Sequence, residues 1–399
     1  MTLLKYALPA LAVAGTAAAQ CSASTTTIQN SGDATALASC TTFTGSIAIA
    51  TGTVDNIELN GIRTIRGSLI ANNVTEMTTL RADSLEEIED TFDLQQLTIL
   101  STLDMPALTK VDTIRWQALP ALQGLNFETA VQEAGTVDIQ NTELNSLDGI
   151  NLKVVDVFYI ANNRYLESMD LQLSNITNAL TMEANAPNLE VSFPNLEWAF
   201  NMTLRNVSSL SIPSLEHVNG SFGLYSNFFE TFSAPNLTTI EGDLSFVDNG
   251  DLTNITMPVL ELVEGGFQIE NNSQLTNING FPELATVGGA LDFTGDFQNV
   301  SLPAIDDVRG AFNMQSTEDI SDACDHFEGM AGQNDVIKGE FTCDAEEDNP
   351  SSIEDGDNND DDDDSDSSND DDEDAAGHIR IPGAVLAFSA FLAALFGLL

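Results

Sequence analysis

The chain has 399 residues, with 12 Lys and Arg against 62 Asp and Glu and a formal net charge of −50. So few cations cannot build a face that neutralises phosphates, and nucleic acid is therefore excluded as a partner. Only four cysteines and three histidines are present. The sequence shows no motif that combines them with a nucleophile, so we predict no catalytic residue, no metal site and no cofactor.

The N-terminus has the features of a targeting segment. The first nineteen residues run from a basic start at Lys5 through an apolar stretch to three alanines, Ala17 to Ala19. This pattern is typical of a secretory signal peptide, which we assign to residues 1–19. A secreted chain enters an oxidising compartment, where cysteines form disulfides.

Repeats dominate the next part of the chain, residues 20–343. Five segments start on a proline and place a glycine seven residues later: Pro213 and Gly220, Pro235 and Gly242, Pro258 and Gly265, Pro282 and Gly289, Pro303 and Gly310. Their spacings of 22, 23, 24 and 21 residues are typical of a solenoid. Weaker copies extend the array over residues 41–320, which at about 22 residues per coil predicts about thirteen coils.

Each glycine is followed, two and four residues later, by large apolar residues that alternate with small or polar ones. The ten apolar positions are Phe222, Leu224, Leu244, Phe246, Phe267, Ile269, Leu291, Phe293, Phe312 and Met314. This alternation predicts one half-buried strand per coil, with the other face toward water, and hence an all-β, parallel β-solenoid. We expect the glycines to supply corners that need a positive φ. Asparagines at 227, 249 and 272 are expected to bond along the axis.

The four cysteines lie at the two ends of the array. Cys21 and Cys40 precede it, Cys324 and Cys343 follow it, and each pair is 19 residues apart. Four cysteines allow three pairings. We predict local pairing, Cys21 with Cys40 and Cys324 with Cys343, because the alternatives would join opposite ends of a rod, beyond the reach of a disulfide.

The chain then becomes acidic. Residues 344–374 hold 18 acidic side chains and no basic one, which predicts a disordered stalk. Small residues at 374–377 and an apolar run over 381–399 then predict a GPI-attachment signal, with residues 375–399 removed on maturation. We predict attachment at Asp374, with Ala375 as the alternative. The other interpretation of the tail is a transmembrane helix, which needs about 20 residues.

Nine Asn-x-Ser/Thr sequons fall in the array, and the secretory address predicts that they carry N-glycans: Asn73, Asn175, Asn201, Asn206, Asn219, Asn236, Asn254, Asn271 and Asn299. Three aromatic residues are candidates for surface contact with a ligand, Tyr225, Phe228 and Phe229. The alternative for these aromatics is that they fill the core or a corner, since aromatic side chains bury large areas where they can.

Several stretches resemble one protein family. They are the run from Cys40 to Ile47, the segments Leu59–Ile62 and Ile65–Leu69, the segment from Asp148, and the proline–glycine series. They are similar to the fungal GPI-anchored cell-wall organisation proteins of the extracellular-mutant and sporulation-specific type, whose repeats resemble receptor L domains. The stalk departs from that family, in which Ser and Thr are usual.

The resemblance implies a non-enzymatic cell-surface glycoprotein that is needed for wall organisation and integrity. Its implied partners are wall polysaccharide or wall proteins and, through a GPI lipid, the outer face of the plasma membrane. The alternative is a wall-modifying glycan hydrolase or transglycosylase. Such an enzyme needs two carboxyl groups close together in a cleft, and the outward acidic residues here are scattered over different coils.

Overall fold

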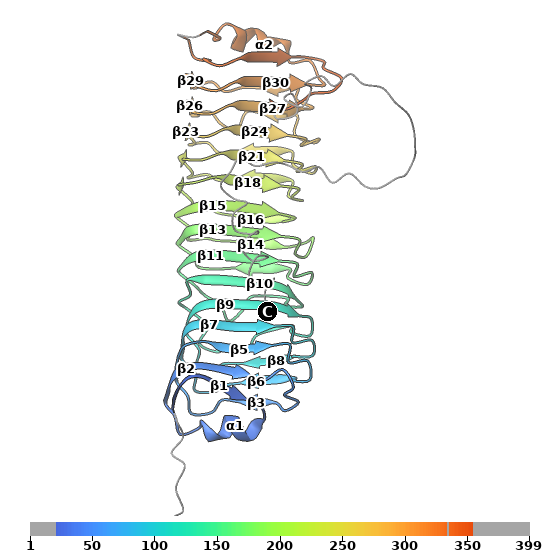
Figure 1. Cartoon of the computed structure of the whole chain (residues 1–399). Coiled ribbons are helices and arrows are strands. Elements are labelled where there is room, and N and C mark those ends of the chain that lie inside the picture. Colours follow the sequence, from blue (N-terminus) through green and yellow to red (C-terminus); the bar gives the residue numbers. More distant parts are fainter. Residues whose placement is uncertain (1–20, 333–334, 354–399) are drawn as a thin grey trace, which may run out of the picture. The chain divides into compact units, whose positions relative to one another are not determined.

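The computed structural model describes residues 21–332 and 335–353, which form one solenoid (Figure 1). The prediction of a parallel β-solenoid is confirmed, with about 13 turns. The predicted signal peptide, the attachment residues Asp374 and Ala375 and the C-terminal propeptide lie outside the described residues. Among those that are described, no helix has the length and apolar character needed to cross a membrane.

One long parallel ladder forms the main wall of the solenoid, and successive coils each add a strand to it (Figure 1). Its strands are β1 (Ser22–Ile28), β2 (Thr42–Ile49), β5 (Leu69–Asn72), β7 (Glu87–Gln95), β9 (Lys110–Leu119), β10 (Thr136–Thr142), β11 (Val154–Ala161), β13 (Asn175–Glu183), β15 (Trp198–Arg205), β18 (Phe222–Tyr225), β21 (Leu244–Val247), β24 (Phe267–Glu270), β27 (Leu291–Gly295), β30 (Phe312–Ser316) and β31 (Phe341–Asp344). We call this set the main sheet.

Shorter strands complete each turn. Some precede the main strands within the same sheet: β4 (Thr64–Arg66), β17 (His217–Val218), β20 (Thr239–Ile240), β23 (Leu262–Val263), β26 (Thr286–Val287) and β29 (Asp307–Val308). Others pair in small parallel sheets of their own: β3 (Ile57–Glu58), β6 (Thr79–Arg81) and β8 (Thr102–Asp104); β12 (Ser168–Asp170), β14 (Glu190–Ser192) and β16 (Ser209–Ser211); β19 (Thr231–Ser233) and β22 (Asn254–Thr256); β25 (Asn277–Ile278) and β28 (Asn299–Val300).

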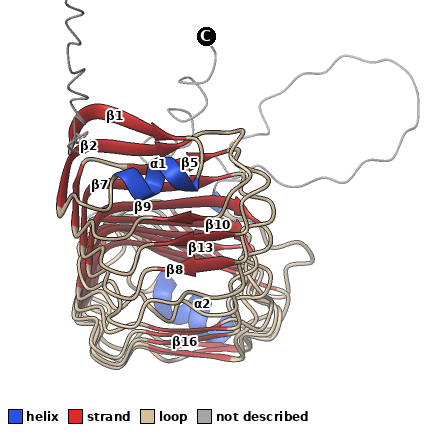
Figure 2. Ribbon diagram, turned by 90° about the horizontal axis from the view of Figure 1, so that it is seen from below, coloured by secondary structure: helices blue, strands red, loops and turns tan. Residues whose placement is uncertain are grey.

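A helix and a disulfide close each end of the stack, as the end-on view in Figure 2 shows for the helices. Helix α1 (Ser31–Ala36) joins β1 to β2, and the disulfide Cys21–Cys40 encloses it. Helix α2 (Ser321–Glu328) joins β30 to β31, and Cys324–Cys343 ties the helix to the last strand. Both disulfides are the local ones that the spacing predicts, with 5.5 Å between Cα atoms.

The core is one continuous apolar cluster that extends from Ile28 to Ile337. All ten positions predicted to point inward are buried, with at most 1% of their surface exposed. Phe267 illustrates how successive coils interlock, because its ring makes edge contacts with Phe281 at 5.0 Å and with Phe293 at 4.9 Å between centroids. Aromatic pairs in this geometry stabilise a core beyond their buried area.

The structure corrects the role of the repeat glycines. Gly220, Gly242, Gly265, Gly289 and Gly310 do not have a positive φ. They stack on one another instead, and a Cβ added to Gly265 would lie 2.6 Å from the carbonyl carbon of Gly242. Glycine is needed here because adjacent coils bring their backbones too close for any side chain.

The left-handed corner lies elsewhere, at the end of the main strands. Ten successive coils each place a non-glycine residue there with φ between 52° and 58°: Asn73, Gln96, Ala118, Asn141, Asn162, Ala184, Asn206, Ser226, Asp248 and Asn271. Six of the ten are Asn or Asp, the residue types that tolerate this conformation best.

Just inside this corner, the predicted asparagine ladder is present. Asn227 Nδ2 donates to Asn249 Oδ1 at 3.0 Å, and Asn249 Nδ2 donates to Asn272 Oδ1 at 3.0 Å. A second, unpredicted step joins Asn163 Nδ2 to Asn185 Oδ1 at 3.2 Å. All five side chains are buried, and their amides pair because an unpaired buried amide is costly.

The chain beyond β31 returns to the outer face of the main sheet, and we call residues 345–353 the strap. Asn313 Nδ2 donates to Ser351 O at 2.9 Å, and Ser351 N donates to Gln315 Oε1 at 3.0 Å. Ile353 N donates to Asp292 Oδ2 at 3.0 Å. Two expectations change. The predicted stalk cannot begin at residue 344, and Asp292 and Asn313 face the strap rather than water, with 7% and 5% exposure.

Candidate binding surfaces

The solenoid has three candidate binding surfaces: the outer face of the main sheet, a pocket beside the strap, and a groove along the N-terminal half. In the two described ranges, no three His, Cys, Asp or Glu side chains come together in a way that suits a metal ion. His217 Nδ1 lies 2.8 Å from Thr239 Oγ1 on the surface, and His326 packs against the ring of Phe327. His217 thus contacts exposed threonine hydroxyls on the solenoid surface, and His326 contacts an aromatic ring.

The outer face of the main sheet is flat and its polar side chains pair with one another. Tyr159 donates to Glu183 Oε1 at 2.6 Å. Asp138 accepts hydrogen bonds from Gln117 at 2.9 Å and from Gln140 at 2.6 Å. Burial raises the pKa of Asp138, and the two glutamine hydrogen bonds oppose that rise. These groups satisfy each other, which leaves few of them free for a ligand.

Acidic residues on this face also serve the stacking. Asp243 Oδ1 accepts from Gly266 N at 2.7 Å, on the next coil, and Glu270 Oε2 accepts from Gln268 at 2.8 Å. Asp292 holds the strap. A glycosidase needs a pair of carboxyl groups converging on one cleft, and these three lie on different coils with separate partners.

The three predicted contact aromatics separate in the structure. Tyr225 lies on the main sheet, where the guanidinium of Arg205 stands 4.4 Å from its ring centroid and the ring covers Gly223. Phe228 follows in the next turn and is 42% exposed. Phe229 is only 3% exposed and packs against Phe232 at 6.0 Å between ring centroids. The prediction of a surface role for Phe229 is therefore wrong, because its ring fills the core, as the alternative interpretation of the aromatics allowed.

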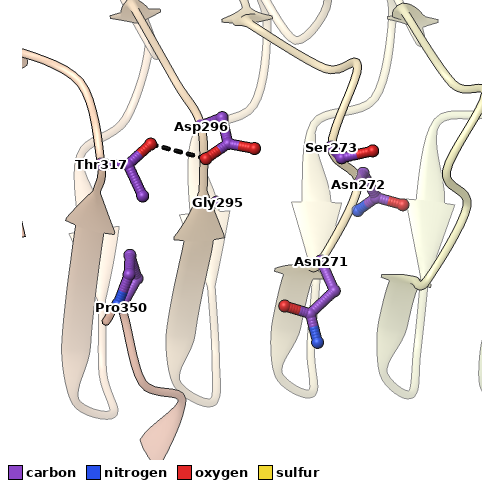
Figure 3. A pocket seen from close by; sticks show the side chains of 7 residues that line it. All are labelled: Asn271, Asn272, Ser273, Gly295, Asp296, Thr317 and Pro350. Atoms are coloured by element: carbon purple, nitrogen blue, oxygen red, sulfur yellow. Dashed lines mark hydrogen bonds between the residues drawn. The ribbon is translucent and has the colours of Figure 1, made fainter. Parts of the chain in front are cut away.

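A small pocket of about 250 Å³ lies where the coils of β24, β27 and β30 turn their corners (Figure 3). Asn271, Asp296 and Thr317 line it, and Pro350 of the strap borders it. Thr317 donates to Asp296 across it. The sequon Asn271 is one of its walls, so an N-glycan there would occupy the mouth.

A second and larger concave surface is a groove of about 1290 Å³, which we call the axial groove. Its lining comes from six successive turns, between Glu87 at the start of β7 and Asn195 just before β15. At about 4.8 Å per strand step, five steps give a length of roughly 24 Å. The register of β7 with β9, and of β11 with β13, shifts beside the groove. Such irregularities bend strands, and the bend makes this part of the wall concave.

Charges alternate along one wall of the axial groove. Glu87, Lys110, Glu133 and Lys153 come from four successive turns. Lys110 Nζ lies 3.1 Å from Glu87 Oε1 and 3.7 Å from Glu133 Oε2, and these carboxylates, Glu87 first, raise the pKa of Lys110. Across the described chain, Lys153 finds no ion-pair partner.

The other lining groups are amides and apolar surface. Asn195 Nδ2 donates to Gln172 Oε1 at 2.7 Å, and Asn151 is exposed beside them. Val154 is 47% exposed, while Ile88 and Val111 are buried at the base. The groove thus offers hydrogen-bond donors, acceptors and apolar contact, with amides on its last four turns and apolar residues on its first four. Sequence reasoning missed it because its residues share no motif.

None of the nine sequon asparagines is buried, so each is placed where a glycan has room. Six are exposed: Asn73, Asn219, Asn236, Asn254, Asn271 and Asn299. The other three, Asn175, Asn201 and Asn206, are half-buried. Which of them carry a glycan remains a prediction.

Comparison with known proteins gives the family. A family model described as Ecm33, GPI-anchored cell wall organization protein, matches residues 1–38. The chain is 42% identical to protein ecm33 of Aspergillus fumigatus, over 88% of both chains. It is 43% identical to a cell surface GPI-anchored protein of Arthroderma benhamiae, over 89% of this chain and 91% of that one. It is also 30% identical to sporulation-specific protein 2 of Saccharomyces cerevisiae, over 67% of this chain and 53% of that protein. No solved structure matches. The chain therefore belongs to the Ecm33 family of GPI-anchored cell-wall organisation proteins, and it is a protein of the cell surface and wall.

Proposed function

We propose that this protein organises the wall without catalysis, by binding wall polymers along its solenoid while a GPI lipid, attached at Asp374 or Ala375, holds it at the membrane. The polymers that it binds are wall polysaccharide or wall proteins. The observation that carries the proposal is the axial groove, which is lined by polar side chains from six successive turns. A polymer with a regular repeat gains from such a surface because each further turn adds a contact without a further loss of freedom.

The geometry gives no support to the enzymatic alternative. The half-buried carboxyl group of Asp138 lies on the outer face of the main sheet, outside the groove, and accepts hydrogen bonds from two glutamines. The carboxylates of Glu87 and Glu133 in the groove flank Lys110. A glycan-cleaving site needs one carboxyl group that donates a proton and a second that attacks or activates water at the same bond.

The test uses the whole mature protein, released from cells by a phosphatidylinositol-specific phospholipase. It is incubated with isolated wall fractions, and both retention on the fractions and the appearance of new reducing ends are measured. We expect retention and no new reducing ends. Time-dependent release of reducing ends would establish the hydrolase alternative, and absence of retention on every fraction would refute polymer binding.

A further inference from the structure

Sequons and basic residues are unevenly distributed along the solenoid. Residues 74–174 contain no sequon and five of the twelve Lys and Arg residues. Residues 206–308 contain six sequons and no Lys or Arg. Residues 206–308 are thus marked for glycan cover, and we call residues 74–174, which lie between the sequons Asn73 and Asn175, the bare segment.

The axial groove lies mainly in the bare segment. Its first five turns, from Glu87 to Ser174, fall within residues 74–174. One sequon, Asn175, borders the far end, where its Oδ1 accepts from Ser174 Oγ at 2.7 Å. Glycans are bulky and solubilising, so a surface that must meet a large polymer is best placed where they are absent.

The charge pattern of the groove defines the ligand. The lining holds four carboxylates, those of Glu87, Glu89, Asp112 and Glu133, and only two lysines, Lys110 and Lys153, so a row of anions finds no continuous counter-charge. A row of cations finds three of the four carboxylates already paired, because Glu87 and Glu133 flank Lys110 and Glu89 lies 3.5 Å from Arg66. The exposed amides of Asn151, Gln172 and Asn195 instead offer both donors and acceptors, as sugar hydroxyl groups do. The exposed Val154 offers apolar contact for the C–H face of a sugar ring.

Building on the function proposed above, we infer that the axial groove binds an uncharged, linear polysaccharide whose chain runs parallel to the solenoid axis. The ligand lies across several turns, and Val154, Asn151 and the Gln172–Asn195 pair contact it. The glycans expected on residues 206–308 keep the groove-bearing part of the solenoid apart from neighbouring surfaces.

The experiment compares two valine variants. Val154→Trp fills the groove, and Val259→Trp places the same bulk on an exposed valine, at 37% exposure, in the C-terminal half. Affinity electrophoresis of the phospholipase-released protein measures binding to soluble β-1,3-glucan, β-1,6-glucan and chito-oligosaccharides, with dextran sulfate as the charged probe. We expect Val154→Trp to weaken binding to at least one neutral glycan about tenfold or more, and Val259→Trp to leave it unchanged. Circular dichroism and thermal unfolding verify that both variants fold.

Two further measurements test the charge argument. Binding to the neutral glycan should persist at about 1 M salt, where surface ion pairs are screened. Lys153→Gln, which keeps a hydrogen-bonding head without the charge, should bind within about twofold of the parent. Binding confined to dextran sulfate, or lost in salt, overturns the assignment of an uncharged ligand.

The outcomes separate the two proposals. If the parent protein binds a neutral glycan and Val154→Trp binds as well as Val259→Trp, the groove is refuted as the site while glycan binding stands. If the parent binds none of the neutral glycans but is retained on wall fractions, this inference fails and wall proteins become the partner. If it is retained on nothing, both the inference and the proposed function fail.

Discussion

Replacing Asn249 by alanine is expected to remove the central step of a buried amide ladder. The side chain is fully buried and makes four hydrogen bonds. Its Oδ1 accepts from the backbone N–H and from Nδ2 of Asn227, and its Nδ2 donates to Leu224 O at 2.9 Å and to Asn272 Oδ1 at 3.0 Å. At about 1 kcal/mol per net hydrogen bond, the loss is about 4 kcal/mol.

Two assays read this loss. Urea unfolding gives the change in stability, and hydrogen exchange followed by mass spectrometry reports on the N–H of Asn227, which bonds to Asn249 Oδ1 at 3.0 Å. A loss of about 4 kcal/mol corresponds to exchange roughly a thousandfold faster where opening limits exchange. The control is Asn277→Ala, since this exposed side chain bonds only to its neighbour Thr276 and should cost under about 0.5 kcal/mol.

A second variant separates hydrogen bonding from shape. Asn249→Asp keeps the volume but cannot donate when ionised, and burial raises the pKa of such a carboxyl group. The folded-state pKa then lies above the unfolded value of about 3.9, so the penalty is largest at neutral pH and shrinks as the pH falls through the folded pKa. Equal stability of Asn249→Ala and Asn277→Ala would refute the reasoning that the ladder holds adjacent coils together.

Three further predictions concern the core, the glycine column and the anchor. Phe267→Ala should cost about 3 to 5 kcal/mol in urea unfolding by leaving a cavity, whereas Gln268→Ala on the opposite face should cost under about 0.5; equal costs would mean that the strand phase is wrong. Gly265→Ala should abolish or strongly destabilise folding, since its Cβ meets the backbone of the coil below, while Gly250→Ala, with open space around it, should be neutral by the same measurement. Truncation after Glu373 should send folded protein into the medium and leave the wall defect of a null strain uncorrected, because untethered protein loses its effective concentration at the wall; full rescue would contradict a role fixed at the surface.

The sequence predicted the repeat and the inward strand positions within each coil. It did not predict features that depend on contacts between one coil and the next. Phe222 and Leu224 could be placed inward because alternation of apolar residues is a local signal. Gly265 was assigned the wrong reason, because a clash with Gly242 is invisible until the register between coils is known. Phe229 was placed on the surface because nothing in its immediate sequence shows that the turn after Phe228 points it inward.

The axial groove illustrates the same limit at the level of function. Lys110 and Lys153 are 43 positions apart in sequence, yet two coil steps bring them to one wall. The one sequence feature that distinguishes this part of the solenoid is the absence of sequons between Asn73 and Asn175. A motif search does not detect this feature, because it finds sequons that are present and not a segment that has none.

The strap determines how a pull on the membrane anchor reaches the fold. Tension along the chain acts first on Ile353 and Ser351. Their hydrogen bonds to the main sheet break before the Cys324–Cys343 disulfide bears the load. Ile353 lies ten positions after Cys343, so release of the strap frees at most about 33 Å of chain at ~3.3 Å per residue. Further tension meets the Cys324–Cys343 disulfide, which shares the force with helix α2 and shields the last strand from peeling. The C-terminal end of the solenoid thus has two attachments in series. The hydrogen bonds of the strap are the weaker one and break first under tension, and the Cys324–Cys343 disulfide is the stronger one.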